Sequence, residues 1–338
     1  MAASSEDRLV GGQAVIEGVM IRSPGRVATA VRAPDQQIIV KSDAYTSLAK
    51  RHRLLGIPVL RGAVSFFEML YIGLGALVFS ADVASGECEK TENGRPHEST
   101  KAEKIKSALM LGGSVLLAFG IGIGLFFALP LLLTEGLGLS ENALSFNLVA
   151  GGIRAAFFLL YLWAISRWKE IGRILAYHGA EHKSIFTFEL GEELTVESAR
   201  KHGTRHPRCG TSFLLIVVIL AILLFATADS IVELKIGHRP TLPQRFLTHF
   251  SLLPLLGGIS FELLKLSGRK RDSVVVRWLT APGLWLQRIT TREPDDGQLE
   301  VAIAALKGAL EEGGSESEHA CTWPASGPGA TPYSSEVR

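Results

Sequence analysis

The chain has 338 residues, 47% of them hydrophobic, and a formal net charge of +2. This near-neutral charge gives no argument for nucleic-acid binding, and three widely separated cysteines argue against a disulfide framework and suit a reducing compartment. The mean hydropathy is positive, which is unusual for a soluble protein and points to membrane helices.

Residues 1–55 are predicted to form a small β unit outside the bilayer. Short β-favouring runs alternate with turn sequences rich in Pro and Gly. The runs are 14–16, 27–31 and 38–40, and the turns are 23–25 and 33–35. Glu17, next to the first run, is expected at a surface position of a strand.

Residues 56–106 are predicted to hold one apolar helix followed by a charged, exposed loop. Glu68 interrupts the apolar stretch, and Arg61 precedes it, so an ion pair is expected there. A charge at this place makes a full membrane crossing doubtful, and a re-entrant or interfacial helix is the preferred interpretation.

Four stronger apolar segments follow, and they predict a mainly α-helical, polytopic membrane protein in contact with the lipid bilayer. The first carries no charge over the 28 residues between Lys106 and Glu135, which exceeds the roughly 20 residues that a spanning helix needs. Helices 1 and 2 are expected within 107–165, and helices 3 and 4 within 210–264. The expected spans are 107–134, 143–165, 210–228 and 246–264. Arg154 is the charged residue inside the second.

The distribution of Lys and Arg predicts the orientation. The segment 166–209 carries eight of them, whereas 229–246 has three and 134–142 has none. Both termini and the central loop 166–209 are therefore expected in the cytoplasm of a bacterium, at its plasma membrane, or in the equivalent compartment of an organelle. A full crossing at 56–81 would break this arrangement.

Beyond the last span, cytoplasmic helices are expected over 265–312. One of them is amphipathic and starts at Pro294-Asp295-Asp296, and it is predicted to pack on the protein. Its apolar positions recur at helical spacing: Leu299, Ala302, Ile303, Leu306 and Leu310. The Gly-, Ser- and Pro-rich tail 313–338 is predicted to be disordered.

The central loop contains the sequence Tyr177-His178-Gly179-Ala180-Glu181-His182-Lys183. On a helix, His178 and His182 lie four residues apart on one face, so both imidazoles can reach one cation. Glu181 projects toward the same region as a candidate general base. This H-x-x-E-H arrangement is the inverted form of a zinc-hydrolase signature, and it predicts a divalent metal site, with zinc as the expected ion. For any one of these histidines alone, a contact with lipid headgroups or a helix cap would be the simpler interpretation.

A catalytic zinc needs a third protein ligand and one open position. Three candidates are His206, Cys209 and Glu262. The thiol of Cys209 stands beside Arg208 at a predicted helix start, where its pKa should fall. Glu262 ends the fourth apolar segment, and its alternative role is a structural pair with Arg154 or Lys265.

Several motifs together resemble the YqhQ family, and the resemblance runs from about residue 10 to residue 310. The motifs are Gly11–Met20, Tyr177–Lys183, His206–Phe213, Pro282–Gln287 and Thr290–Asp296. The family consists of bacterial and plastid multi-pass membrane proteins of unknown function, described at most as predicted metal-dependent enzymes. The resemblance implies a membrane location and a metal site, and it supplies no substrate.

Two functions follow from these observations. The first is a metal-dependent hydrolase at the cytoplasmic face, with Glu181 taking a proton from water that the metal activates. The second is a transporter or a membrane-protein assembly or scaffold factor, in which Glu68, Arg154 and Glu262 line a path or hold helices together.

Overall fold

The computed structural model describes residues 10–48, 56–86, 101–138, 143–207, 209–269 and 274–310. The chain forms two compact units, each assembled from separate stretches. Unit 1 consists of Met1–Gly94, Gly172–His206 and Thr291–Arg338, and unit 2 of Arg95–Ile171 and Pro207–Thr290. The predicted disordered tail and most of the charged loop before residue 101 lie outside the described residues.

Unit 1 contains a four-stranded antiparallel sheet in which each strand pairs with the next in the chain. The strands are β1 (Gly11–Val15), β2 (Gly18–Arg22), β3 (Arg26–Arg32) and β4 (Ile38–Ala44). The β unit predicted from the sequence is thus confirmed, with both predicted turns in place. β2 was not predicted, because its glycine and the adjacent turn residues leave only a short apolar run.

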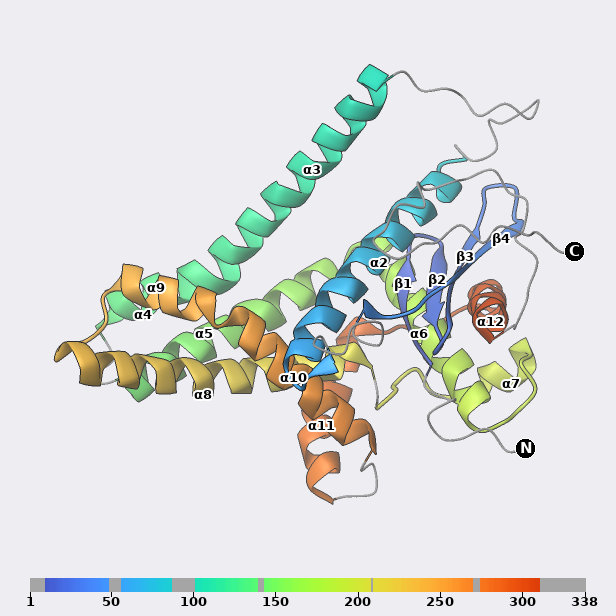
Figure 1. The fold of residues 1–338 in the computed structure, drawn as a ribbon. Coiled ribbons are helices and arrows are strands. Elements are labelled where there is room, and N and C mark those ends of the chain that lie inside the picture. The colour runs from blue at the N-terminus through green and yellow to red at the C-terminus, as the bar shows by residue number, and fades with distance from the viewer. Residues whose placement is uncertain are drawn as a thin grey trace, which may run out of the picture. The chain divides into compact units, whose positions relative to one another are not determined.

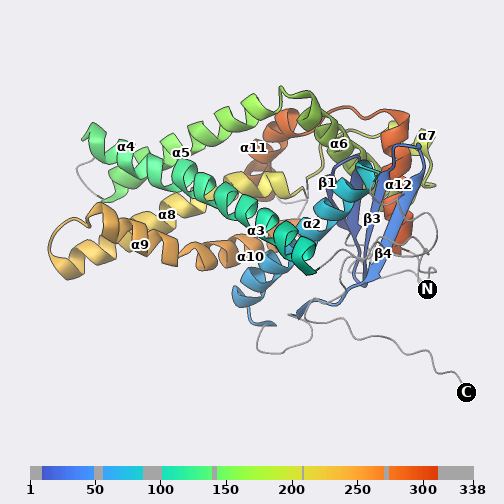
Figure 2. The same cartoon turned by 90° about the horizontal axis from the view of Figure 1, so that it is seen from above.

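Both faces of this sheet are covered by helices (Figures 1 and 2). Successive side chains of a strand point to opposite faces, and in β2 the residues Val19 and Ile21 enter one apolar cluster while Met20 enters another. The first cluster also contains residues of α12 (Asp296–Leu310), and the second contains residues of α2 (Leu60–Ala84). Since both faces are buried, β2 and β3 lack the polar alternation of a half-exposed strand.

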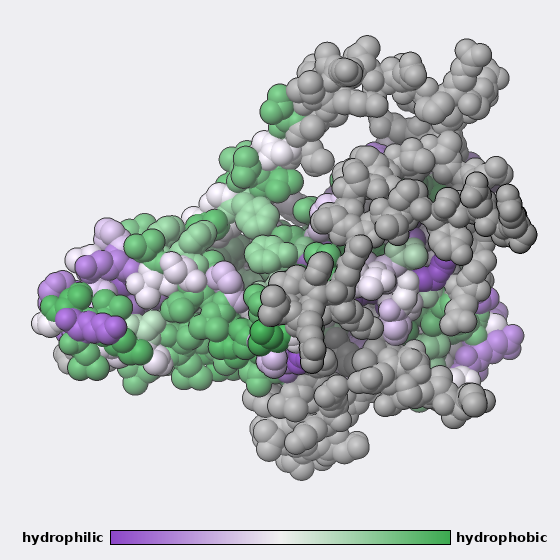
Figure 3. All heavy atoms as spheres, in the orientation of Figure 1, coloured by the Kyte–Doolittle hydropathy of each residue, from purple (hydrophilic) through white to green (hydrophobic). Residues whose placement is uncertain are grey.

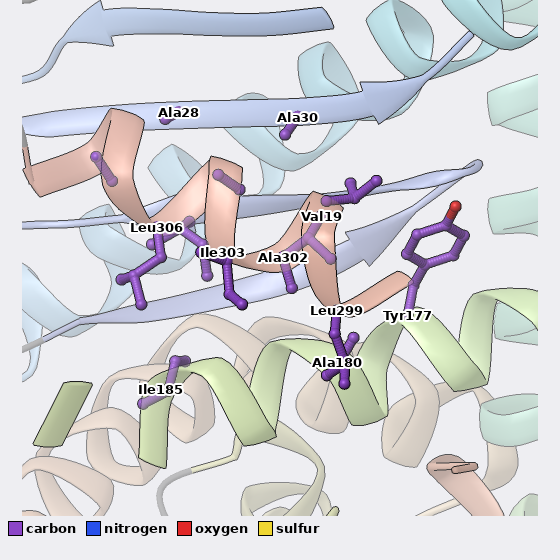
Figure 4. Packing of buried hydrophobic residues seen from close by; sticks show 14 of the residues in the cluster. Val19, Ala28, Ala30, Tyr177, Ala180, Ile185, Leu299, Ala302, Ile303 and Leu306 are labelled. Atoms are coloured by element: carbon purple, nitrogen blue, oxygen red, sulfur yellow. The ribbon is translucent and has the colours of Figure 1, made fainter. Parts of the chain in front are cut away.

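The amphipathic helix predicted near the C-terminus is confirmed as α12, and it packs on the sheet. Figure 4 shows Ala302, Ile303 and Leu306 of α12 next to Val19, Ala28 and Ala30 of the strands. The small side chains in this interface allow a close approach of helix and sheet. At Gly308, a Cβ atom would meet Val40 Cγ1 at 3.0 Å. The helix begins with a capping box, in which Asp295 and Gln298 bind each other's backbone N–H.

The segment 56–81, predicted as a re-entrant or interfacial helix, is helical from Leu60 onward and belongs there to the continuous 25-residue helix α2. Its buried side is a stripe of mostly small residues, at Gly62, Ser65, Gly73, Ala76, Phe79, Ser80 and Val83. Its opposite side exposes large apolar residues, among them Phe66, Phe67 and Tyr71. Glu68 is compatible with this helix because its carboxylate accepts hydrogen bonds from Ser47 Oγ, at 2.7 Å, and from the backbone N–H of Leu48.

The central segment 166–209, expected as a loop, is largely helical. It contains α6 (Lys169–Glu189) and α7 (Val196–Arg200). From Gly172 onward α6 belongs to unit 1, where Tyr177, Ala180 and Ile185 pack with α12 and the sheet (Figure 4). The H-x-x-E-H sequence is therefore part of a buried helix.

Unit 2 is a bundle of apolar helices. The first helical run is α3 (Lys101–Ile123), the π-helical turn η3 (Gly124–Ala128) and α4 (Leu129–Leu137), and it is followed by α5 (Ala143–Ile165). The second half contains α8 (Gly210–Ile236), α9 (Leu242–Ser251), α10 (Leu253–Arg269) and α11 (Val274–Thr290). Figure 3 shows hydrophobic side chains over much of the visible face of these helices, and hydrophilic ones gathered around the connection from α8 to α9.

Among the described residues, four helices are long and apolar enough to cross a membrane. They are Leu60–Ala84, Gly112–Leu137, Ala143–Ile165 and Val217–Ile236, and a fifth arises if the bent pair α9 and α10 counts as one span. The sequence predicts four spans and the structure has four candidates, but the two sets differ. The helix α2 is among the four candidates, whereas the predicted span 246–264 is not. The fourth predicted span, 246–264, is not one straight helix, because α9 and α10 meet at 45°. Pro254 explains the break, since proline in a first turn cannot continue the preceding helix.

Candidate metal centre

Helix α6 brings the two histidines of the H-x-x-E-H sequence together. The ring centroids of His178 and His182 are 4.5 Å apart. His182 is 1% exposed, and His178 is partly buried. The two imidazoles therefore lie on one face of the helix, as their spacing predicts.

The orientation of the His182 ring is fixed by the backbone of the segment that follows α7. Its Nδ1 lies 2.5 Å from the carbonyl oxygen of Thr204. A carbonyl oxygen can only accept, so Nδ1 carries a proton, and in the neutral imidazole Nε2 then carries the lone pair. That Nε2 is buried and has no hydrogen-bond partner among the described residues. Metal-binding histidines show this same arrangement, in which one ring nitrogen donates to a carbonyl and the other is left for the ion.

Cys209 belongs to unit 2, so its role as a third ligand stays a prediction from the sequence. The two imidazoles that α6 brings together are donors that suit zinc.

His206, the second candidate for a third ligand, is buried three residues before Cys209. Its ring lies beside that of His182, at 5.7 Å between centroids, and its Nε2 is 3.6 Å from Glu189 Oε2. The carboxylate of Glu189 thus faces this nitrogen. His206 stays a candidate ligand from the sequence, because either ring nitrogen of an imidazole can bind a metal.

Glu181 is buried between the histidines and strand β1. Its Oε2 is 3.9 Å from His178 Nε2, and its carboxylate accepts a hydrogen bond from the backbone N–H of Gly12. Burial raises the pKa of Glu181, while His178 and the Gly12 hydrogen bond act in the opposite direction. A raised pKa brings a carboxylate closer to neutral pH, where it accepts and returns protons most effectively.

Gly12 and Gly179 allow the backbone to approach this centre closely. A Cβ at Gly12 would lie 2.3 Å from Met20 O and 3.2 Å from Glu181 Oε1. A Cβ at Gly179 would lie 2.0 Å from Arg292 O. The segment containing Arg292 runs along α6, where its backbone N–H donates to Leu175 O at 2.9 Å. Both glycines are therefore needed for space.

Two ion pairs attach neighbouring segments to α6, and sequence reasoning missed both. Glu17 lies in the turn between β1 and β2, with φ 50°, and not at a surface strand position as expected. Its carboxylate accepts hydrogen bonds from Arg173 and from Tyr177 Oη. Burial and the nearby Glu17 raise the pKa of Tyr177. On the other side, the buried Lys183 pairs with Glu293 and donates to Arg200 O.

The remaining predicted polar residues lie elsewhere. Arg61 is in the first turn of α2, and Glu68 binds the segment of Ser47 and Leu48. Arg154 and Glu262 belong to unit 2, on α5 and α10. The contacts of Arg154 are with Phe126 O, at 2.8 Å, and with the rings of Phe127 and Phe225.

Comparison with known proteins gives a family without an assigned activity. The profile of a family described as "Protein of unknown function (DUF1385)" matches residues 57–312. The chain is 32% identical over 311 residues to the "Uncharacterized protein YqhQ" of Bacillus subtilis (strain 168), covering 89% of this chain and 92% of that protein. No solved structure is significantly similar.

Proposed function

Because the chain belongs to the DUF1385 family, for which no activity is given, we propose from the geometry of unit 1 that it is a metal-dependent hydrolase at a membrane surface. One observation carries the proposal. The Nε2 lone pair of His182 is buried without a hydrogen-bond donor, and it lies on the same helix face as His178. Burying a polar atom without a partner is unfavourable. A cation held by both imidazoles would remove that penalty.

The ligands fit zinc. Two histidines are common zinc ligands, and a catalytic site would take one further protein ligand and keep one position for water. When bound, such a cation supplies Lewis acidity and lowers the pKa of water. The Thr204 carbonyl keeps His182 in the tautomer that can bind it.

Glu181 distinguishes a hydrolase from a simple metal store. Its carboxylate lies 3.9 Å from the Nε2 of His178, too far for a hydrogen bond but close enough to reach a water held beside His178. In the proposed reaction Glu181 takes a proton from the attacking water and passes it to the leaving group. A site that only binds metal would not need a buried carboxylate whose ionisation is disfavoured.

The connectivity of the chain supports a location of unit 1 on one side of a membrane. The chain leaves unit 1 after Gly94 and after His206, and it returns at Gly172 and at Thr291. Each excursion contains two of the apolar spans, if the bent pair counts as one. Two crossings return the chain to the side from which it left. The excess of Lys and Arg in segment 166–209 makes the cytoplasmic side the proposed one.

The same reasoning excludes a full crossing by α2 in this arrangement. A crossing there would place the sheet and α6 on opposite sides of the membrane, although they share one core. We therefore propose that α2 lies at the interface and turns its row of exposed aromatic and aliphatic side chains toward the lipid.

The test uses the full chain in lipid nanodiscs, loaded with zinc. We expect one zinc per chain in the wild type and in Glu181→Gln, and less than a tenth of that in His178→Ala. A panel of peptide, N-acyl and lipid-linked amides should include a substrate that the wild type hydrolyses and Glu181→Gln does not. His238→Ala is the matched control, because His238 is an exposed histidine outside the centre.

Two results would overturn the proposal. Absence of stoichiometric metal in the wild type would remove the centre itself. Full hydrolysis by Glu181→Gln would leave Glu181 without a catalytic role, and a transport or scaffold function would then be the better account.

A further inference from the structure

Unit 2 contains a second polar feature, independent of the metal centre. Arg154 lies in α5, eleven residues from each end of the helix Ala143–Ile165. A cation at the middle of an apolar helix is unfavourable in a membrane unless it is paired, and such residues commonly mark binding or transport paths.

Within the described residues, the contacts of Arg154 include no carboxylate. Its Nε donates to Phe126 O at 2.8 Å, and its guanidinium carbon lies 5.6 Å from the ring centroids of Phe127 and Phe225. A guanidinium has five N–H donors, so most of them remain for another partner. The carbonyl that it binds belongs to η3, and π-helical turns of this kind occur frequently at functional sites.

The guanidinium lines a groove of about 540 Å³ formed by α3, η3, α5, α8 and α10. Among the described residues that line it, Arg154 is the only charged one, and the others are Gly, Ala, Val, Leu, Ile or Phe, for example Gly122, Ala221 and Leu256. Its volume lies in the range of sites for small organic ligands. Phe119 and Leu253 at its edge are exposed, so the groove opens on the outer surface of the bundle.

We propose that this groove binds a long-chain carboxylate, with the acyl chain along the apolar walls and the carboxylate on Arg154. The match is one of charge and shape. One buried cation fits one anion, and a guanidinium can bind a carboxylate through two parallel hydrogen bonds. A phospholipid headgroup would bring further polar atoms, for which the described lining of the groove offers no second polar side chain.

The experiment is native mass spectrometry of the full chain in detergent, titrated separately with palmitate, methyl palmitate and phosphatidylglycerol. We expect one palmitate per chain, bound at least tenfold more tightly than the uncharged ester. Arg154→Gln should reduce palmitate binding at least tenfold and leave the weak binding of the ester unchanged.

A second variant tests the groove without touching the charge. A side chain at Gly122 would enter open space in the groove wall, so Gly122→Leu should fold and should block the ligand. Gly120→Leu is the matched control, because Gly120 also has open space at its Cβ and does not line the groove. It should bind palmitate as the wild type does.

Equal binding of palmitate and its ester, or full palmitate binding by Arg154→Gln or by Gly122→Leu, would overturn the proposal. Phosphatidylglycerol that binds more tightly than palmitate and depends on Arg154 would overturn the assignment to a free carboxylate. If Arg154→Gln fails to fold, the comparison of Gly122→Leu with Gly120→Leu still decides.

Discussion

Among the described residues, each unit contains a cluster of buried polar side chains around a histidine, and the clusters differ in what surrounds that histidine. In unit 2, the carboxylate of Asp229 accepts hydrogen bonds from Asn147, Arg245 and His249, at 2.8 to 2.9 Å. Asp229 and His249 are completely buried. The carboxylate and the guanidinium neutralise each other, so this cluster is closed by its own members.

In unit 1, the cluster around His182 is not closed in this way. His182 and His249 each have a buried ring nitrogen without a hydrogen-bond partner among the described residues. His249 stacks on Phe225, with ring centroids 4.2 Å apart, whereas His182 faces a second imidazole. The comparison shows that the groups next to a buried histidine decide its role. Charges that neutralise each other hold helices together, and two adjacent imidazoles provide a place for a cation.

The largest effect is expected from a variant that breaks the Asp229 cluster of unit 2. Asp229→Ala leaves the buried Arg245 without its carboxylate. Removing one partner of a buried ion pair typically costs about 3–5 kcal/mol. We expect a loss of that size in the free energy of unfolding of the full chain in detergent, with zinc content per folded chain unchanged. Lys235→Ala, at an exposed position of the same helix, should change stability little. Unaltered stability of Asp229→Ala would show that the network does not hold unit 2 together.

The next effect concerns the open cluster. Gly179→Ala places a methyl group 2.0 Å from Arg292 O, and a backbone atom cannot rotate away. We expect a destabilisation of about 1–3 kcal/mol, typical of overpacking, together with weaker zinc binding, because Gly179 is adjacent to His178. Gly203→Ala is the control in the same unit, since its Cβ would meet nothing within 4 Å. Zinc affinity equal to that of the wild type would show that the Arg292 segment is not needed for the centre.

Glu181→Gln should have the opposite effect on stability. Burial raises the pKa of Glu181 above its unfolded value, so ionisation disfavours the folded state. In metal-free protein, this carboxyl therefore contributes stability below its unfolded pKa, and the contribution is lost as the pH rises through the folded pKa. At neutral pH we expect Glu181→Gln to unfold at a temperature a few degrees higher than the wild type when both are treated with chelator. The difference should vanish in acid. A lower melting temperature for the variant would contradict the assigned cause of the pKa shift.

The smallest effect is expected at the surface of unit 1. Arg200 and Asp296 form an ion pair at 2.6 Å, with side chains 58% and 61% exposed. Exposed pairs contribute little to stability, and salt screens them. Arg200→Ala should lower the free energy of unfolding far less than Asp229→Ala does, and less at high salt. A loss as large as that of Asp229→Ala would remove the contrast between buried and exposed pairs.

The sequence predicted the parts of the fold that depend on local pattern. The β runs, the turns at 23–25 and 33–35, and the apolar spacing of α12 are all encoded within short windows. The bend between α9 and α10 was missed because apolar length was weighed without Pro254. The fully buried sheet was missed because α12, which covers one face, comes from the far end of the chain.

For the candidate centre, helix periodicity was enough to place His178 and His182 on one face. It could not show that the Thr204 carbonyl orients His182, or that Glu189 faces His206, since these contacts join α6 to a segment beyond α7. Gly12 lies in the motif Gly11–Met20, and Gly179 lies in the motif Tyr177–Lys183. A glycine in such a motif can indicate a close approach of the backbone. Their reason is steric and becomes visible only with the neighbouring chain in place.

The central claim is that α6 presents a ligand pair for a metal, and X-ray absorption at the zinc edge tests it most directly. We predict that full-length protein purified in the presence of zinc holds one ion per chain, with scattering from at least two imidazole nitrogens. His182→Ala should lose the ion. A zinc ion whose absorption spectrum shows no imidazole scattering would contradict the account. Wild-type protein that holds no zinc would contradict it as well.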